Sequence, residues 1–184
     1  MRQRIVAVTG VSGVGKTTCL KFVAKRIGFQ HLQASALIQS ARASQSALPV
    51  SHDDLRKQDI DQNQTLLLSG FAQQASSIAR IIVIDGHTII EVGETVQPIG
   101  PAIFGALRIS RMVFLWDDPS LIAQRRQIDI RRSRPNKLPA EIHGLQAAAA
   151  EQAQVICEAL EVPLTIHDLT KASFISTLYG NGPA

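Results

Sequence analysis

The sequence predicts an α/β fold: a five-stranded parallel sheet with helices on both faces, in a single domain over residues 1–184. Two observations predict it. Short runs of branched apolar residues at 4–9, 80–85 and 111–116 are too short for buried helices, and they alternate with segments of helical periodicity. Strands that alternate with helices form parallel sheets covered on both sides. With 45% hydrophobic and 18% charged residues in 184, the composition is that of one globular domain with a substantial core.

The first half of the chain begins with a strand at 4–9, followed by helical spacing over 16–27 that ends near Gly28. Residues 29–33 predict a second strand, although few of them are β-branched, and 34–43 a short helix. Pro49 predicts a break over 44–50, which is a candidate hinge. Ser51 as a cap, with acidic residues after it, predicts a helix that runs to about residue 79.

The second half repeats this alternation, with buried strands at 80–85 and 111–116 and a further strand at 163–167. Gly93, Pro98, Gly100 and Pro101 predict a loop over 86–101, before a short helix at 102–107. Asp118 followed by a proline is the signature of a capped helix, here through about residue 126. An Ala-rich run predicts a helix over 140–160, a last helix is expected over 170–179, and 180–184 is expected to be a frayed tail.

A phosphate-binding loop (P-loop) is predicted between the first strand and the first helix, where residues 10–17 read GVSGVGKT and fit G-x-x-x-x-G-K-[ST]. Glycines let the backbone aim successive N–H groups at an anion, and the helix N-terminus adds partial positive charge. A chance Gly-rich turn is disfavoured because a strand precedes the motif and a helix follows it. The motif predicts binding of a nucleoside triphosphate, with Lys16 as a catalytic residue at the β- and γ-phosphates. The expected ATP contacts are Gly10, Ser12, Gly13, Val14, Gly15, Lys16, Thr17, Thr18 and, later in the chain, Arg126.

A magnesium site is predicted from Thr17 and Asp85. Asp85 ends the strand at 80–85, which would deliver it to the carboxyl edge of the sheet beside the P-loop. A hydroxyl and a carboxylate there would bind Mg²⁺ together with the phosphates. An ordinary Asp-Gly turn is the alternative, and the nearby P-loop favours the metal. His87 either contacts the acceptor substrate or braces the loop, and the sequence leaves both open.

A lid is predicted over residues 127–139, because about a third of the basic side chains fall in the short stretch 125–137. Arginines stay charged when desolvated and bind phosphate oxygens with two donors, so Arg125, Arg132 and Arg134 are candidate catalytic residues over the migrating phosphoryl group. The alternatives are a solvated basic face or a nucleic-acid patch. Nucleic acid is an improbable partner because no aromatic residue interleaves these arginines.

An acceptor-binding region is predicted over residues 34–79, which hold the segment HDDLRK at 52–57. Arg56 or Lys57 could grip an acceptor phosphate. Taken alone, an exposed helix start with local ion pairs explains this segment slightly better.

The ordered series RIVAVTGVSGVGKTT, HDDLRK, IIVIDGHTII, VQPIGPAIFGAL, VFLWDDPSLIAQRR and DIRRSR resembles the archaeal-type adenylate kinases over about residues 4–170. The resemblance implies Mg²⁺-dependent phosphoryl transfer from ATP to AMP, on a five-stranded core with a small acceptor region and a short lid. It places Arg56 on the acceptor arginine, and Asp85 and His87 on the D-x-H pattern. Members are often oligomeric, so a homo-oligomer is possible. The lid arginines of the family fall on Arg125, Arg126, Arg132 and Arg134.

The chain departs from this family pattern in three places. His143 is followed by GLQAAAA instead of a sequence with an Asn-Arg pair. His52 replaces an arginine, and Arg131 stands where a hydroxyl residue is usual. These departures leave the fold expectation unchanged and leave the acceptor open.

Four functions remain to be compared. A monophosphate acceptor is already an anionic nucleophile, whereas a hydroxyl acceptor needs a carboxylate base near the end of the second strand, where the chain reads Gln33-Ala34-Ser35. This favours a nucleoside monophosphate kinase over a small-molecule kinase with a hydroxyl acceptor. The other alternative is an ATPase module that acts with a protein or ribonucleoprotein partner. A GTPase is disfavoured because no N-K-x-D sequence is found.

The remaining features concern the compartment. No charged-then-apolar leader and no apolar run of membrane-spanning length is seen, so we expect a cytoplasmic protein without a membrane partner. Cys19 and Cys157 lack metal or redox spacing and are expected to be buried thiols. The net charge of +4 is a mild basic excess.

Overall fold

The computed structural model describes residues 3–45, 60–129 and 137–169. Strands β1 (Arg4–Thr9), β2 (Gln30–Gln33), β3 (Ile81–Asp85), β6 (Arg111–Trp116) and β7 (Leu164–Asp168) form the main sheet, and β4 (Ile89–Val92) pairs with β5 (Thr95–Pro98). The helices are α1 (Lys16–Ala24), α2 (Ala34–Gln45), α4 (Ile60–Gln74), α5 (Pro101–Ala106), α6 (Pro119–Ile128) and α7 (Pro139–Leu160). None of the helices in these ranges combines the length and hydrophobicity that a membrane-spanning helix requires.

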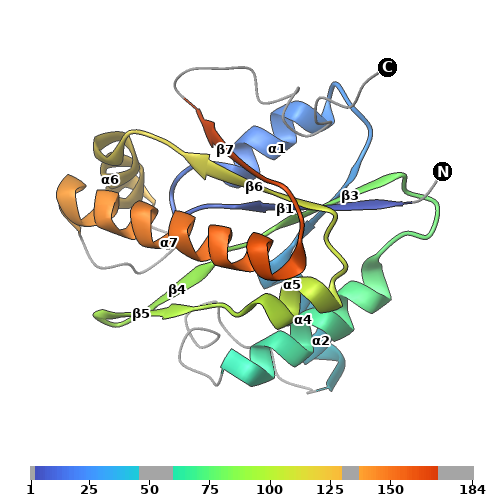
Figure 1. Ribbon diagram of the computed structural model, residues 1–184. Coiled ribbons are helices and arrows are strands. Elements are labelled where there is room, and N and C mark those ends of the chain that lie inside the picture. The colour runs from blue at the N-terminus through green and yellow to red at the C-terminus, as the bar shows by residue number, and fades with distance from the viewer. Residues whose placement is uncertain (1–2, 46–59, 130–136, 170–184) are drawn as a thin grey trace.

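The main sheet confirms the predicted fold class: its five strands run parallel in the order β2-β3-β1-β6-β7 (Figure 1). The connection from β1 to β2 runs toward one edge of the sheet, whereas the connections from β2 to β3, from β3 to β6 and from β6 to β7 run toward the other edge. Right-handed crossovers therefore place α1 on one face, and α2, α4, α5 and α7 on the other. In Figure 1 helix α7 crosses the front of the sheet.

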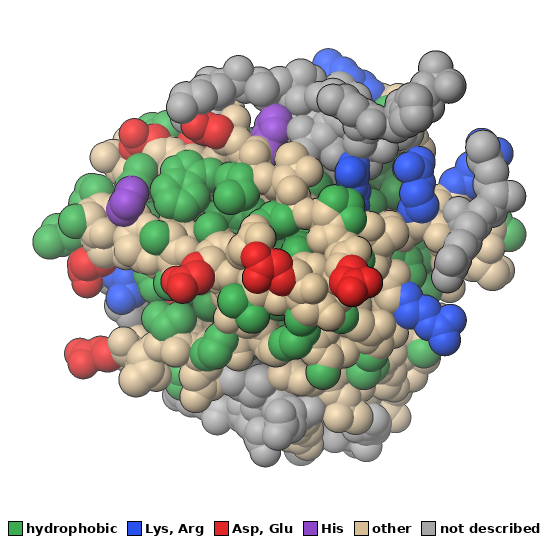
Figure 2. Space-filling model, in the orientation of Figure 1, with side chains coloured by type: hydrophobic (Ala, Val, Ile, Leu, Met, Phe, Trp, Pro, Cys, Tyr) green, Lys and Arg blue, Asp and Glu red, His purple; other side chains and the backbone are tan. Residues whose placement is uncertain are grey.

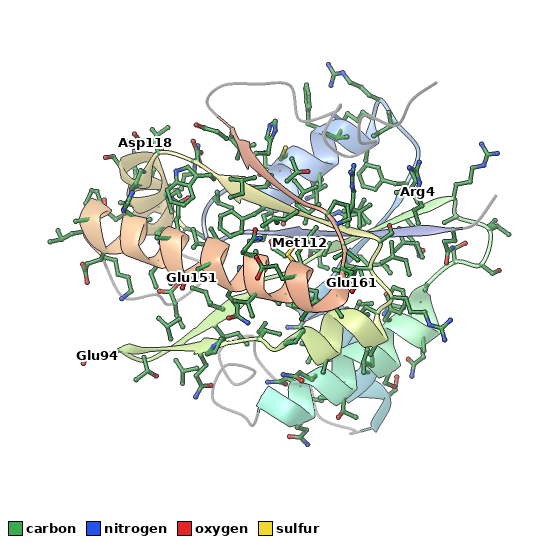
Figure 3. The ribbon with its side chains drawn as sticks, in the orientation of Figure 1. Arg4, Glu94, Met112, Asp118, Glu151 and Glu161 are labelled. Carbon is green, nitrogen blue, oxygen red and sulfur yellow. The ribbon has the colours of Figure 1, made fainter. Side chains whose placement is uncertain are left out.

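The core lies on the central strands, which are buried on both faces as expected for a parallel sheet. Val8, Ile82 and Phe114 have no exposed surface. Figure 3 places Met112 in the middle of this sheet. The outer face of α7 is polar by contrast, and Figure 2 shows a row of acidic side chains along it. Burial raises the pKa of the Cys19 and Cys157 thiols to about 11, so both are protonated at neutral pH.

The parallel register brings the functional edge together. Val8 pairs with Asp85, and Gln33 pairs with Asp85 from the other side. The ends of β1, β2 and β3 therefore meet in one row, directly below the loop that follows β1. Ligands of open α/β sheets bind at this edge.

The predicted loop over 86–101 is wrong, because these residues contain the β4–β5 hairpin. Gly93 takes a left-handed φ of 60° at the turn, and the Thr95 hydroxyl donates to the Val92 carbonyl across it. Pro98 stands at the end of an edge strand, where it needs no ladder N–H. Glycine and proline thus mark the turn and the end of a hairpin in this segment, not a loop.

The predicted helix over 51–79 is only partly described, and its end is wrong by five residues, because α4 ends at Gln74. The Gln30 side chain explains the early end. Its Nε2 donates to the Gln74 carbonyl at 2.7 Å, and its Oε1 accepts from the Ser76 amide at 2.8 Å. A side chain from β2 thus satisfies backbone groups at the helix C-terminus. Helix α2 continues to Gln45, two residues beyond its predicted end, the rest of the predicted break at 44–50 lies outside the described residues, and so does the predicted helix at 170–179.

Candidate functional site

The P-loop links β1 to α1 through glycines in conformations that other residues avoid. Gly10, Gly13 and Gly15 have φ of 145°, 86° and 99°. A Cβ on Gly10 would lie 2.8 Å from the Leu115 carbonyl oxygen, so the next strand leaves no room for a side chain. Gly15 is the N-cap residue of α1, which begins at Lys16. The amides of the first helical turn therefore open toward the loop, as anion binding requires.

The first part of the loop is held by two side chains that donate to its carbonyl groups. Lys16 Nζ lies 2.8 Å from the Gly10 oxygen and 3.2 Å from the Val11 oxygen. His87 Nδ1 also lies 2.8 Å from the Gly10 oxygen. Because a carbonyl only accepts, Nδ1 is the protonated ring nitrogen, and its 3.4 Å contact with Lys16 Nζ is not a hydrogen bond. His87 therefore braces the P-loop and also lines the cavity described below.

The second part of the loop is held by two neighbouring arginines of α6. Arg125 Nη1 donates to the Val14 carbonyl at 3.3 Å, and Arg126 Nε donates to the Ser12 carbonyl at 2.9 Å. The hydroxyl of Ser12 is buried and makes no hydrogen bond with a described residue. A buried orphan hydroxyl inside a loop of inward amides fits an anion, which would supply the missing acceptor.

Thr17 and Asp85 come together as predicted, with Thr17 Oγ1 donating to Asp85 Oδ2 at 2.8 Å. Gln33 Nε2 donates to the same threonine oxygen at 3.1 Å. Asp85 is 7% exposed, and His31 Nε2 lies 3.5 Å from its Oδ2. Two hard oxygen donors beside a P-loop fit Mg²⁺, which binds through one or two protein oxygens, phosphates and waters.

The pKa of Asp85 is lowered although burial acts to raise it. Against burial stand the contact with His31, the positive charge of Lys16, the hydrogen bond from Thr17 and the charge of His87. Asp85 is therefore ionised at neutral pH. Ionisation is what a metal ligand needs.

Arg125 is aimed by a chain of contacts from α7. Gln146, which has no exposed surface, accepts from the Asp117 amide and donates to the Asp117 carbonyl. The buried Asp117 carboxylate in turn accepts from Arg125 Nη1 at 2.6 Å. Asp118 caps α6 as predicted, by accepting from the amides of Ser120 and Leu121.

A cavity of about 680 Å³ extends from the P-loop toward α2, α4 and α5. At its loop end lie Lys16, Thr17, Asp85 and Arg125, with Asp129 at the end of α6. Its other end, here called the acceptor end, is apolar with amide groups. The side chains that line the acceptor end are Ile38, Asn63, Gln64, Leu67, Ile90, Ile99, Ile103, Phe104 and Leu107.

The predicted residues divide into three groups. Lys16, Thr17, Thr18, Asp85, His87 and Arg125 line the cavity together with Ser12, Gly13 and Gly15. Gly10, Val14 and Arg126 are not among its lining residues: Val14 is fully buried, and the Arg126 guanidinium is engaged by Ser12 and by Glu91. Arg56, Arg132 and Arg134 lie outside the described residues, as does most of the predicted lid.

Sequence reasoning missed Gln33, His31, Glu91 and Asn63 as site residues. Gln33 carries a findable signal, since it ends a predicted strand next to the one that ends at Asp85. Glu91 carries none, because the glycines and prolines of its segment predict a loop. Asn63 shows no signal either, because a polar residue within a helix is ordinary.

Comparison with known proteins gives three findings. The family described as an AAA domain matches residues 9–143. An adenylate kinase of Thermoplasma acidophilum is 31% identical over 69% of this chain and 68% of that protein, and one of Thermoplasma volcanium is 28% identical over 71% of each. A solved shikimate kinase of Bacteroides thetaiotaomicron shares the fold, with a TM-score of 0.56 and 16% identity over 95% of this chain and 93% of that one.

Proposed function

Because the chain belongs to the AAA domain family and, over the part shared with curated relatives, to the adenylate kinases, we propose that it transfers the γ-phosphoryl group of ATP to AMP. The chain is an ATP-dependent phosphotransferase and a nucleoside monophosphate kinase. We propose AMP as the acceptor, Mg²⁺ as the metal, and a role for each of the residues named below.

The observation that carries the proposal is the two-ended cavity. Among its described lining residues the carboxylates are Asp85 and Asp129, and neither belongs to the acceptor end. Gln33 stands at the end of β2, and its amide cannot act as a general base. A hydroxyl acceptor would need such a base, whereas a phosphate acceptor is already an anionic nucleophile. The geometry therefore supports a monophosphate acceptor.

The acceptor end also suits a nucleobase. Its lining side chains among the described residues are apolar or neutral amides, and the cationic ones, Lys16 and Arg125, belong to the loop end. A flat base can bury its faces against Ile38 and Phe104, and the neutral amides of Gln64 and of Asn63, whose Oδ1 accepts from Arg42 Nη2, line the same end.

Lys16, Thr17, Asp85 and Arg125 of the loop end each have a proposed role in transfer. The loop amides and Lys16 hold the β- and γ-phosphates of ATP, and Arg125 neutralises charge on the transferred group. Thr17 and Asp85 would hold Mg²⁺, which when bound neutralises charge on the β- and γ-phosphate oxygens. Arg132 and Arg134 close over the phosphates, and Arg56 binds the acceptor phosphate.

A coupled assay for ADP tests the proposal, with ATP-Mg²⁺ and each of AMP, CMP, GMP and UMP. We expect rapid ADP formation that requires AMP. Turnover with another monophosphate alone would correct the acceptor. Slow phosphate release that no monophosphate stimulates would contradict the proposal and support the ATPase alternative.

A further inference from the structure

Arg126 lies under the P-loop, where it is buried by contacts on both sides. Its side chain is 3% exposed. Its stem packs against Gly13, where a Cβ would lie 3.0 Å from Arg126 Cγ. Its Nε donates to the Ser12 carbonyl at 2.9 Å. Gly13 and the Ser12 carbonyl of the P-loop thus hold the Arg126 side chain in place.

The rest of the guanidinium is held by Glu91 of the β4–β5 hairpin. Nη2 donates to Oε1 at 2.9 Å and Nη1 to Oε2 at 3.3 Å, which is the two-pronged geometry that arginine and carboxylate favour. The Glu91 side chain is 20% exposed. Because alternate residues of a strand face opposite sides, Ile90 lines the cavity while Glu91 faces Arg126. In Figure 1 this hairpin lies below α7.

The hydrogen bond to Ser12 has a consequence for phosphate binding. In a planar trans peptide the carbonyl of one residue and the N–H of the next point in opposite directions. Arg126 draws the Ser12 carbonyl away from the loop centre, so the Gly13 N–H is turned toward it. Gly13 lines the cavity, and with φ of 86° and no side chain it does not hold this peptide plane by itself.

From these contacts we propose that Glu91 is a positioning residue for the ATP phosphates: it aims Arg126, which sets the peptide between Ser12 and Gly13. The proposal rests on the ATP site of the proposed function, and it is independent of the acceptor. Without the Glu91 carboxylate, the Arg126 guanidinium is a buried charge without its partner. It can then move and lose its hydrogen bond to the Ser12 carbonyl.

Calorimetric titration with ADP tests this, since it needs no acceptor and no turnover. For Glu91→Gln we expect the Kd for ADP and the KM for ATP to rise about tenfold, as for one lost charge-assisted hydrogen bond. The KM for the acceptor should stay within about twofold. Glu94→Gln is the matched control, because it makes the same change at the tip of the same hairpin, where Glu94 points away from the molecule (Figure 3). It should leave all three constants unchanged.

A purely structural role would give a different result. If Glu91→Gln lowered the Tm while the Kd for ADP stayed within about twofold, or if the acceptor KM rose as much as the ATP KM, the proposal would be overturned. Should Glu91→Gln not fold, the double variant Glu91→Gln with Arg126→Met removes the buried charge as well. That variant should fold and still bind ADP weakly, and wild-type affinity in it would refute the positioning role. Absence of monophosphate kinase activity would reject the proposed function and leave the ADP titration valid.

Discussion

Helix α4 packs directly against the backbone of α2 at Gly70. A Cβ built on Gly70 would lie 2.3 Å from the Leu37 carbonyl oxygen and 2.8 Å from its carbonyl carbon. Backbone atoms cannot turn aside as a side chain can. To restore an ordinary contact of about 3.5 Å, the helices would have to separate by roughly 1 Å. Leu37 is 1% exposed, so the separation would open the core beneath it.

Two effects of Gly70→Ala oppose each other. In an unhindered helix, alanine stabilises by up to about 1 kcal/mol relative to glycine. Overpacking costs about 1–3 kcal/mol, and more where backbone must move. We expect the clash to prevail, with a net loss of about 2 kcal/mol in the free energy of unfolding. Since α2 and α4 supply Ile38 and Asn63 to the cavity, the acceptor KM should also rise.

Urea unfolding of Gly70→Ala and Gly144→Ala provides the matched comparison. Gly144 lies within α7, is exposed, and has no atom within 4 Å of a built Cβ. Gly144→Ala should therefore stabilise the protein by about 0.5–1 kcal/mol. A Gly70→Ala protein as stable as the wild type would refute the packing argument.

Three further predictions concern the site. Lys16→Ala should abolish turnover with the circular dichroism spectrum retained, because the P-loop amides then lack the ammonium group that holds the β- and γ-phosphates. Asp85 is ionised in the fold with a lowered pKa, so its stabilisation is present above the ordinary carboxyl pKa of about 4 and is lost as the pH falls through the folded value. Urea titrations from pH 6 to 3 should therefore show a shallower loss of unfolding free energy for Asp85→Asn than for the wild type or Glu94→Gln, and equal slopes would argue against the lowered pKa. Arg56→Ala should raise the acceptor KM about ten- to a hundredfold in steady-state assays, and an equal rise for ATP would show that Arg56 does not serve the acceptor.

The strands of the main sheet were predictable because buried parallel strands are short, apolar and rich in β-branched residues. The segment Ile81-Ile82-Val83-Ile84 has no competing helical reading, and the acid that follows it reaches the sheet edge by topology alone. The P-loop was predictable because its conformation demands glycines at fixed positions. In both cases, local chemistry decides the structure.

The rest depended on contacts between distant segments. The end of α4 is decided by the Gln30 side chain, which comes from β2. The orientation of Arg126 depends on its ion pair with Glu91, which lies 35 residues earlier in the chain. Glu91 belongs to a hairpin whose glycines and prolines predict a loop. A sequence pattern indicates that an arginine lies near phosphate, but it does not show which acidic residue forms an ion pair with that arginine.

Phosphorus NMR of a mixture of ATP, AMP and Mg²⁺ with the protein tests phosphoryl transfer most directly, because it resolves every phosphorus species at once. Transfer between the two ends of the cavity predicts that each AMP consumed yields two ADP, one from each nucleotide, without inorganic phosphate. Inorganic phosphate that accumulates with ADP while AMP stays constant would show that water is the acceptor, and would contradict a monophosphate site at the acceptor end.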